Sequence, residues 1–187
     1  MWTRIAWLAA SVLAIAFNTT VIPDQAWAVI CANDPAGAPP TFPADDGGSP
    51  ESTACGEAAD ANGGGSGHNT AIGVDSNASG LGGANTATGA GANANGSGGF
   101  NTAIGTLSNA SGNGGANVAI GLSARAIGNG SGNTAVGAGA AANFDNSAAF
   151  GAGATVTRAN QQVFGTGTNT YTTAGIRSRR ASSATSW

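Results

Sequence analysis

The chain has 187 residues, of which only 8% are charged and 32 are glycine. Globular domains carry roughly 25% charged residues, and a nucleic-acid-binding protein needs a basic face to neutralise phosphates. A chain with a net charge of −3 and no lysine fits neither a nucleic-acid partner nor an ordinary soluble enzyme. The composition therefore predicts either a disordered chain or a repeat architecture.

Residues 1–28 have the pattern of a secretory signal peptide. Arg4 supplies the positive charge, residues 5–17 form an uncharged apolar run, and Ala26 and Ala28 are small residues at the −3 and −1 positions of a cleavage site. The apolar run is shorter than the roughly 20 residues that a membrane-spanning helix needs. We expect cleavage after Ala28 and export to the cell surface, the outer membrane or the medium.

Residues 29–66 form an acidic leader rich in proline and glycine, for which disorder is the favoured interpretation of residues 29–60. The leader holds both cysteines, Cys31 and Cys55. In an oxidising compartment such a pair predicts a disulfide, with free thiols or pairing between chains as the alternatives. Two cysteines without nearby histidines are an incomplete metal site, so we expect no metal.

Residues 67–165 repeat one short phrase, which reads Asn-Thr-Ala-Ile-Gly in its first copy at residues 69–73. The glycines that end the copies recur at a constant interval, which shortens slightly for the last two copies, and a random glycine-rich sequence would not keep that phase. We expect these glycines to form turns that need positive φ. They are Gly73, Gly89, Gly105, Gly121, Gly137, Gly151 and Gly165.

Each repeat also has a second half, in which small residues stand two apart, as Ser76 and Ala78 do. Period-2 alternation is typical of a strand. The spacing predicts two strands of four or five residues per repeat, joined by a glycine-rich connection, and it predicts no helix. Equivalent strands would stack in parallel as the rungs of an all-β solenoid.

Stacking of the repeats would place equivalent residues in columns. We expect an apolar column to face the interior of the coil and the alanine column, Ala71 onward, to face the opposite side. The asparagine column, Asn69 to Asn133, would form side-chain amide ladders. The predicted core column consists of Ile72, Thr88, Ile104, Ile120, Val136, Phe150 and Phe164.

The small side chains of the repeat bear on its stability. Ordering one coil of the repeat costs more free energy than the burial of one isoleucine and several alanines returns. Large uncharged faces usually mark an interface. We therefore expect several copies of the chain to associate side by side.

The phrase Thr-Ala-Ile-Gly-x-x-Ser, at residues 70–76 and 102–108, resembles the head repeats of trimeric autotransporter adhesins, the YadA-like (Hep/Hag) family. The resemblance implies a left-handed parallel β-roll, a homotrimer and a bacterial surface adhesin. It also implies attachment to extracellular matrix proteins, host cells or other surfaces, and the motif is linked in that family to collagen binding. Residues 166–187 form a basic tail, expected to be flexible, without the heptads of a stalk or the alternating strands of a membrane anchor.

Several other functions conflict with the residues. Disorder of the array conflicts with its phase, and a calcium-binding roll needs more aspartates than Asp75 and Asp145. An ice-binding face needs regular threonines, but the threonine column is interrupted by Val118. His68 has no partner at a diagnostic spacing, so the prediction is a non-enzymatic adhesin head without a cofactor. The alternative is a secreted structural or ice- or surface-binding solenoid.

Overall fold

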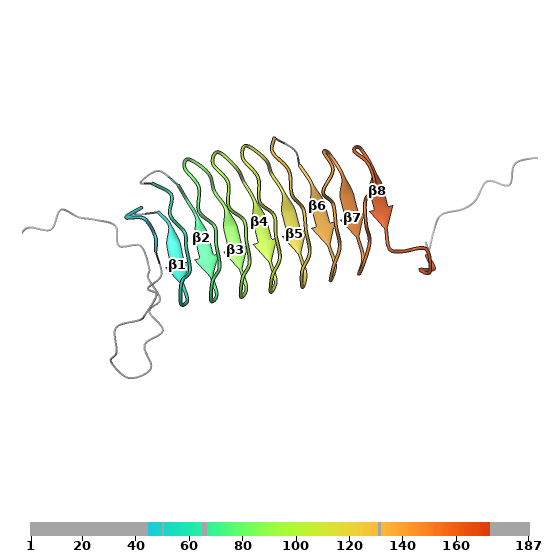
Figure 1. The fold of residues 1–187 in the computed structure, drawn as a ribbon, viewed down its shortest axis with the longest axis horizontal. Coiled ribbons are helices and arrows are strands. Elements are labelled where there is room, and N and C mark those ends of the chain that lie inside the picture. Colours follow the sequence, from blue (N-terminus) through green and yellow to red (C-terminus); the bar gives the residue numbers. More distant parts are fainter. Residues whose placement is uncertain (1–44, 50, 65–66, 131, 173–187) are drawn as a thin grey trace, which may run out of the picture.

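The computed structural model describes residues 45–49, 51–64, 67–130 and 132–172, and these residues form one parallel β-solenoid of about seven turns (Figure 1). No helix occurs among them. One sheet holds eight strands in chain order. The strands are β1 (Thr53–Cys55), β2 (Thr70–Ile72), β3 (Thr86–Thr88), β4 (Thr102–Ile104), β5 (Val118–Ile120), β6 (Thr134–Val136), β7 (Ala148–Phe150) and β8 (Gln162–Phe164). This confirms the all-β, parallel solenoid prediction.

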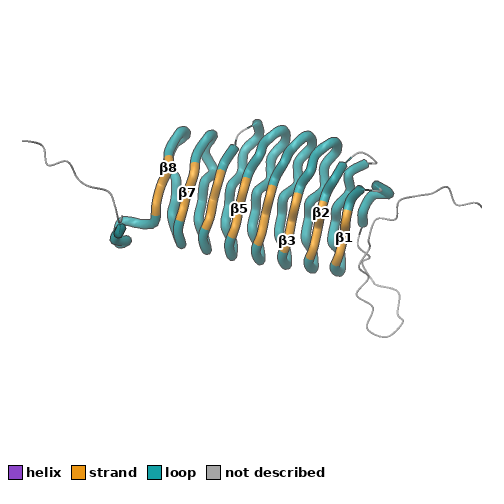
Figure 2. Tube along the Cα trace, turned by 180° about the vertical axis from the view of Figure 1, so that it is seen from behind, coloured by secondary structure: helices purple, strands orange, loops and turns teal. Residues whose placement is uncertain are grey.

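The rungs stack in register. Ala71 pairs with Ala87, and each later strand pairs with the next at the equivalent residue. The register survives where the repeat shortens after β6, since Val136 pairs with Phe150 and Phe150 with Phe164. Seven steps of about 4.8 Å give the row of strands a length of about 34 Å. Seen from behind, the loops that join the strands form a second continuous wall (Figure 2).

The second half of each repeat is shorter than predicted. Instead of a strand of four or five residues, it contributes one bridging residue per rung, as in the pairings of Asn77 with Asn93 and of Asn93 with Asn109. The neighbouring Ser76 and Ala78 are fully buried, so the alternation itself holds. A turn ends directly before this short stretch and the glycine-rich connection begins soon after it, which leaves no room for a longer ladder.

The array begins before the predicted boundary at residue 67. Strand β1 pairs with β2 through Thr53, Ala54 and Cys55, and Ala54 is fully buried in line with the later alanines. Residues in this part of the predicted leader are therefore an ordered rung. The signal was present as Thr-Ala-Cys-Gly at 53–56, but cysteine replaces isoleucine there and the interval to Gly73 is longer than the later ones. Cys31, the signal peptide and residues from 173 onward lie outside the described residues, so the disulfide stays a prediction.

The predicted core column is wrong, because the alanines occupy the interior of the coil. Ala71, Ala103 and Ala119 are fully buried, whereas Ile72 and Ile104 are each 41% exposed. Neighbouring residues on a strand point to opposite faces, so only one of each pair can point inward. The opposite wall of the coil also consists mainly of small buried residues, such as Ser76 and Ala78. The residues that the structure places on the outer side are Ile72, Thr88, Ile104, Ile120, Val136, Phe150 and Phe164.

Candidate functional site

The outer side of the sheet is the first candidate surface, and we call it the strand face. It consists of two columns, a half-buried one at the first residue of each strand and a more exposed one at the third. Ile72, Ile104 and Ile120 are 38–41% exposed in this second column. The columns from β2 to β6 are Thr70, Thr86, Thr102, Val118 and Thr134, and Ile72, Thr88, Ile104, Ile120 and Val136. From β2 to β6 the strand face is thus uncharged, with five threonines and five aliphatic residues.

The strand face changes character where the repeat shortens. The rings of Phe150 and Phe164 stack with their centroids 5.1 Å apart and their planes 17° from parallel. A hollow of about 270 Å³ lies beside them, lined among others by Thr134, Asn146 and Gln162. The apolar column therefore continues through β7 and β8 as an aromatic stack.

The glycine that follows each strand has a structural role. Gly105 has φ of +124°, and a Cβ placed there would lie 2.7 Å from the carbonyl oxygen of Gly121 in the next rung. The same close approach recurs at Gly73, Gly89 and Gly121. Glycine is required because a side chain would both strain the backbone and push the rungs apart. These glycines build the stack and leave the strand face unobstructed.

The asparagine column lies inside the coil and satisfies its backbone. The Asn101 side-chain oxygen accepts the backbone N–H of Asn117 at 3.2 Å, and its amide donates to the Gly112 carbonyl at 2.8 Å. Asn69 and Asn85 make the same two kinds of hydrogen bond in their rungs. The ladder therefore runs mainly from side chain to backbone, not from amide to amide as predicted. It satisfies interior polar groups that water cannot reach.

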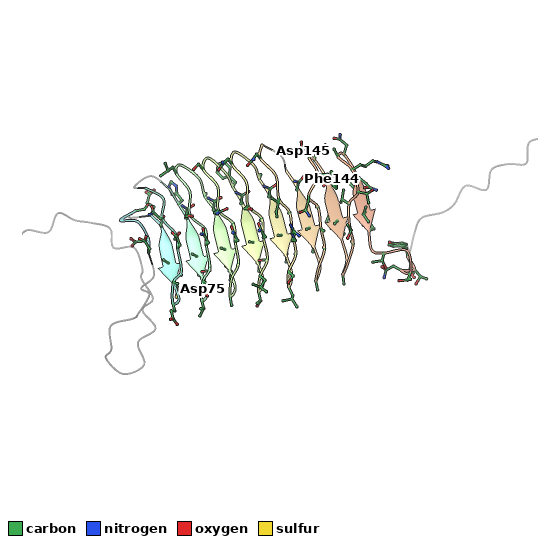
Figure 3. All side chains as sticks on the ribbon, viewed as in Figure 1. Asp75, Phe144 and Asp145 are labelled. Atoms are coloured by element: carbon green, nitrogen blue, oxygen red, sulfur yellow. The ribbon has the colours of Figure 1, made fainter. Side chains whose placement is uncertain are left out.

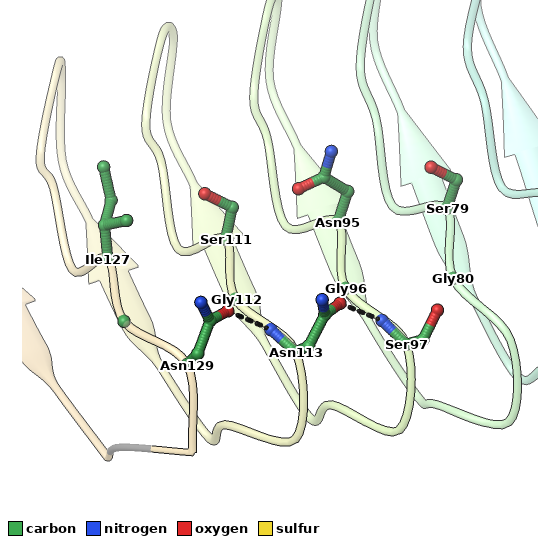
Figure 4. Close-up of a pocket in the computed structure, with 11 residues that line it drawn as sticks. Ser79, Gly80, Asn95, Gly96, Ser97, Ser111, Gly112, Asn113, Ile127 and Asn129 are labelled. Atoms are coloured by element: carbon green, nitrogen blue, oxygen red, sulfur yellow. Dashed lines mark hydrogen bonds between the residues drawn. The ribbon is translucent and has the colours of Figure 1, made fainter.

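The long glycine-rich connection of each repeat forms the second candidate surface, a groove of about 470 Å³ (Figure 4). Four consecutive rungs contribute to it, and none of the residues that line it is charged. The sequence predicted only a glycine-rich connection here and did not indicate the groove. Its signal was the recurrence of serine and asparagine on both sides of the column Gly80, Gly96 and Gly112.

The charged residues of the described chain are few and dispersed. His68 Nε2 lies 2.5 Å from Glu51 Oε2, but both side chains are more than 60% exposed, so solvent weakens their attraction. Asp75 and Asp145 lie at opposite edges of the solenoid (Figure 3). Within the described ranges, no three or more histidine, cysteine, aspartate or glutamate residues gather as a metal ligand set would. The described part of the chain also has no helix long and apolar enough to cross a membrane.

Comparison of the sequence with known proteins identifies no similar protein. No protein family, curated protein or solved structure matches the sequence. The resemblance to YadA-like head repeats therefore stays a prediction made from the residues of the repeat.

Proposed function

We propose that the chain is a non-enzymatic adhesive head of an exported bacterial surface protein, and that it acts as a homotrimer of left-handed β-rolls. The observation that carries the proposal is the combination of an alanine interior with exposed isoleucines on the strand face. The fully buried hydrophobic side chains are alanines, and Val156 is the one larger buried hydrophobic residue among those described. The larger apolar side chains lie outside the coil, where a partner can cover them.

A second copy of the chain is the partner that best fits the strand face. The face is as long as the solenoid and repeats at every rung, so its match is another face of the same period. Each alanine removes little apolar surface from water, whereas a buried isoleucine contributes roughly 1.5–3 kcal/mol. Covering Ile72, Ile104 and Ile120 would supply burial that the narrow interior lacks. This argument supports association of copies, and the family resemblance supports three of them.

The adhesive role follows from what such an assembly leaves exposed. The connections and turns would repeat along three parallel columns and present the same groups many times to a surface. Multivalent contact raises the strength of attachment far above that of one contact. The targets that we propose are extracellular matrix proteins, host cells or other surfaces.

The association is tested by measuring the mass of the purified chain in solution by sedimentation equilibrium. We expect a trimer, and we expect Ile104→Asp combined with Ile120→Asp to shift it toward monomer because charges on the strand face would be buried without partners. Leu81→Asp is the matched control, since Leu81 is 60% exposed but lies in a long connection away from the strands. A folded monomer of the unmodified chain would contradict the proposal.

Adhesion is tested with beads that carry the purified chain. They should attach to surfaces coated with extracellular matrix protein or to cultured cells more than beads that carry an unrelated protein of the same charge. Equal attachment of the two kinds of bead would contradict an adhesive role.

An ice- or surface-binding solenoid is a second candidate, and one observation favours it. The structure places the first and third residues of each strand on the same outer side, so Thr86 and Thr88 stand side by side there. Single threonines continue this row in the neighbouring strands at Thr70 and Thr102, about 4.8 Å to either side. Thermal hysteresis in a solution of monomeric protein would support this function over a trimeric head.

A further inference from the structure

The groove in the long connections has a floor of backbone and no side chains. Gly80, Gly96 and Gly112 have φ between +152° and +156°, a backbone conformation that residues other than glycine rarely adopt. A Cβ at any of them would lie 2.0–2.3 Å from the carbonyl oxygen of the glycine in the next rung. The glycines are therefore required by the stack, and a channel along the solenoid axis is the consequence.

The walls of the groove carry amides and hydroxyls. Ser79, Asn95 and Ser111 stand on one side, and Ser97, Asn113 and Asn129 on the other (Figure 4). The hydroxyls of Ser79 and Ser111 donate to asparagine oxygens, each at 2.8 Å, which fixes those two side chains.

Some side-chain amide donors along this groove have no acceptor among the described residues. The Asn113 oxygen accepts the backbone N–H of Ser97 at 2.8 Å, and the Asn129 oxygen accepts that of Asn113 at 2.9 Å. The amide NH₂ groups of Asn113 and Asn129, and the whole side-chain amide of Asn95, make no hydrogen bond with the described residues. Asn95 is half-exposed and Asn113 and Asn129 are exposed, so their donors can reach a ligand. Asn113 and Asn129 are one rung apart on one side of the groove, and Asn95 lies on the other side (Figure 4).

The chemistry of the groove excludes most classes of ligand. An anion or cation would find no opposite charge, since no lining residue is charged. An apolar ligand would find only the side chain of Ile127. A peptide adding as a strand needs free backbone groups, but the N–H groups of Gly96 and Gly112 already donate to the rung before. The class of ligand that remains compatible with the groove is a neutral chain molecule with many hydroxyl groups.

We propose that this groove binds a linear, uncharged oligosaccharide, which lies along the solenoid axis with about one sugar unit for each rung. The side-chain amides of Asn95, Asn113 and Asn129 donate to its hydroxyls, and the serine hydroxyls accept from them. The rung spacing of about 4.8 Å is close to the length of one pyranose unit, so successive sugars each lie beside at least one serine or asparagine side chain. The inference rests on the proposed adhesive function and deepens it by naming the class of ligand.

The test is titration calorimetry of the full chain with cellotetraose, maltotetraose and laminaritetraose. We expect saturable binding of at least one of them and at least a fivefold weaker affinity in Asn95→Ala. Asn143→Ala is the matched control, because Asn143 occupies the same position of its repeat but does not line the groove. Binding of none of the three, or equal affinity in the two variants, would overturn the proposal.

Attachment assays separate this inference from the adhesive function itself. If the beads attach to matrix protein but the chain binds no oligosaccharide, the proposed ligand of the groove is refuted and the adhesive function stands. If the chain binds an oligosaccharide but the beads attach to no coated surface or cell, the adhesive function is refuted and the oligosaccharide site in the groove stands.

Discussion

The substitution Asn101→Asp tests whether the buried asparagine ladder holds the solenoid together. The change is isosteric and keeps an oxygen that can accept the Asn117 N–H at 3.2 Å. It removes the NH₂ group that donates to the Gly112 carbonyl at 2.8 Å. The same NH₂ group also donates to the Asn95 carbonyl at 3.4 Å. The substitution therefore removes these two donated hydrogen bonds and adds one buried charge, without a change in side-chain size.

The expected cost follows from burial. Asn101 is fully buried, and loss of its hydrogen bond to the part-buried Gly112 carbonyl costs about 1 kcal/mol. An ionised carboxylate in that place, without a cation beside it, adds several kcal/mol. We expect the free energy of unfolding per chain to fall by at least about 3 kcal/mol at pH 7.

The cost should depend on pH. Burial raises the pKa of the introduced carboxyl in the folded state above its unfolded value of about 3.9, so the folded chain binds the extra proton. Stability is then lost as pH rises from about 3.9 through the folded pKa, and the deficit is smallest near pH 3. A protonated carboxyl can also donate to the Gly112 carbonyl.

Urea unfolding followed by circular dichroism, from pH 3 to pH 8, measures both effects. Asn109→Asp is the control, because the Asn109 oxygen accepts from Ser111 N–H and Oγ, and a carboxylate can accept both bonds. If the two variants differed by less than about 1 kcal/mol at pH 7, the ladder would not be the stabilising element that its geometry indicates.

Three further predictions concern the turns and the strand face. Gly105→Ala should lower the free energy of unfolding, measured with urea, by several kcal/mol, because a Cβ there lies 2.7 Å from the Gly121 carbonyl oxygen. The control Gly114→Ala, at φ +64° with open space around it, should lower it by only about 1–2 kcal/mol. Equal losses in the two variants would refute the close-approach argument. Leu107 has φ of +57°, so Leu107→Asn should raise stability by up to about 1 kcal/mol in urea unfolding. A loss would show that contacts of the leucine side chain, which lies against Gly91 of the preceding rung, outweigh the backbone strain. Ile104→Asp alone should weaken association, measured by sedimentation, more than it reduces the circular dichroism signal of the strands; complete loss of that signal at high protein concentration would contradict an exterior position.

The sequence by itself determined the period, the phase and the parallel stacking. Evenly spaced glycines allow one turn per repeat, and small residues two apart indicate strands, so the rungs follow from local chemistry. The first rung at Thr53 escaped detection because substitution of isoleucine by Cys55 weakened the phrase. The asparagine column was visible too, but its preference for backbone partners was not, because that depends on which carbonyls the next connection brings near.

Only the tertiary structure decided which face of the strands lies inside. Alternation along a strand says that Ala71 and Ile72 point to opposite sides, but it does not say which side is enclosed. The second half of the repeat decides this, because its buried small residues, such as Ser76 and Ala78, lie across the coil from the alanine side of the strands. The groove likewise arises from the stacking of glycines many residues apart in the chain, which no single repeat reveals.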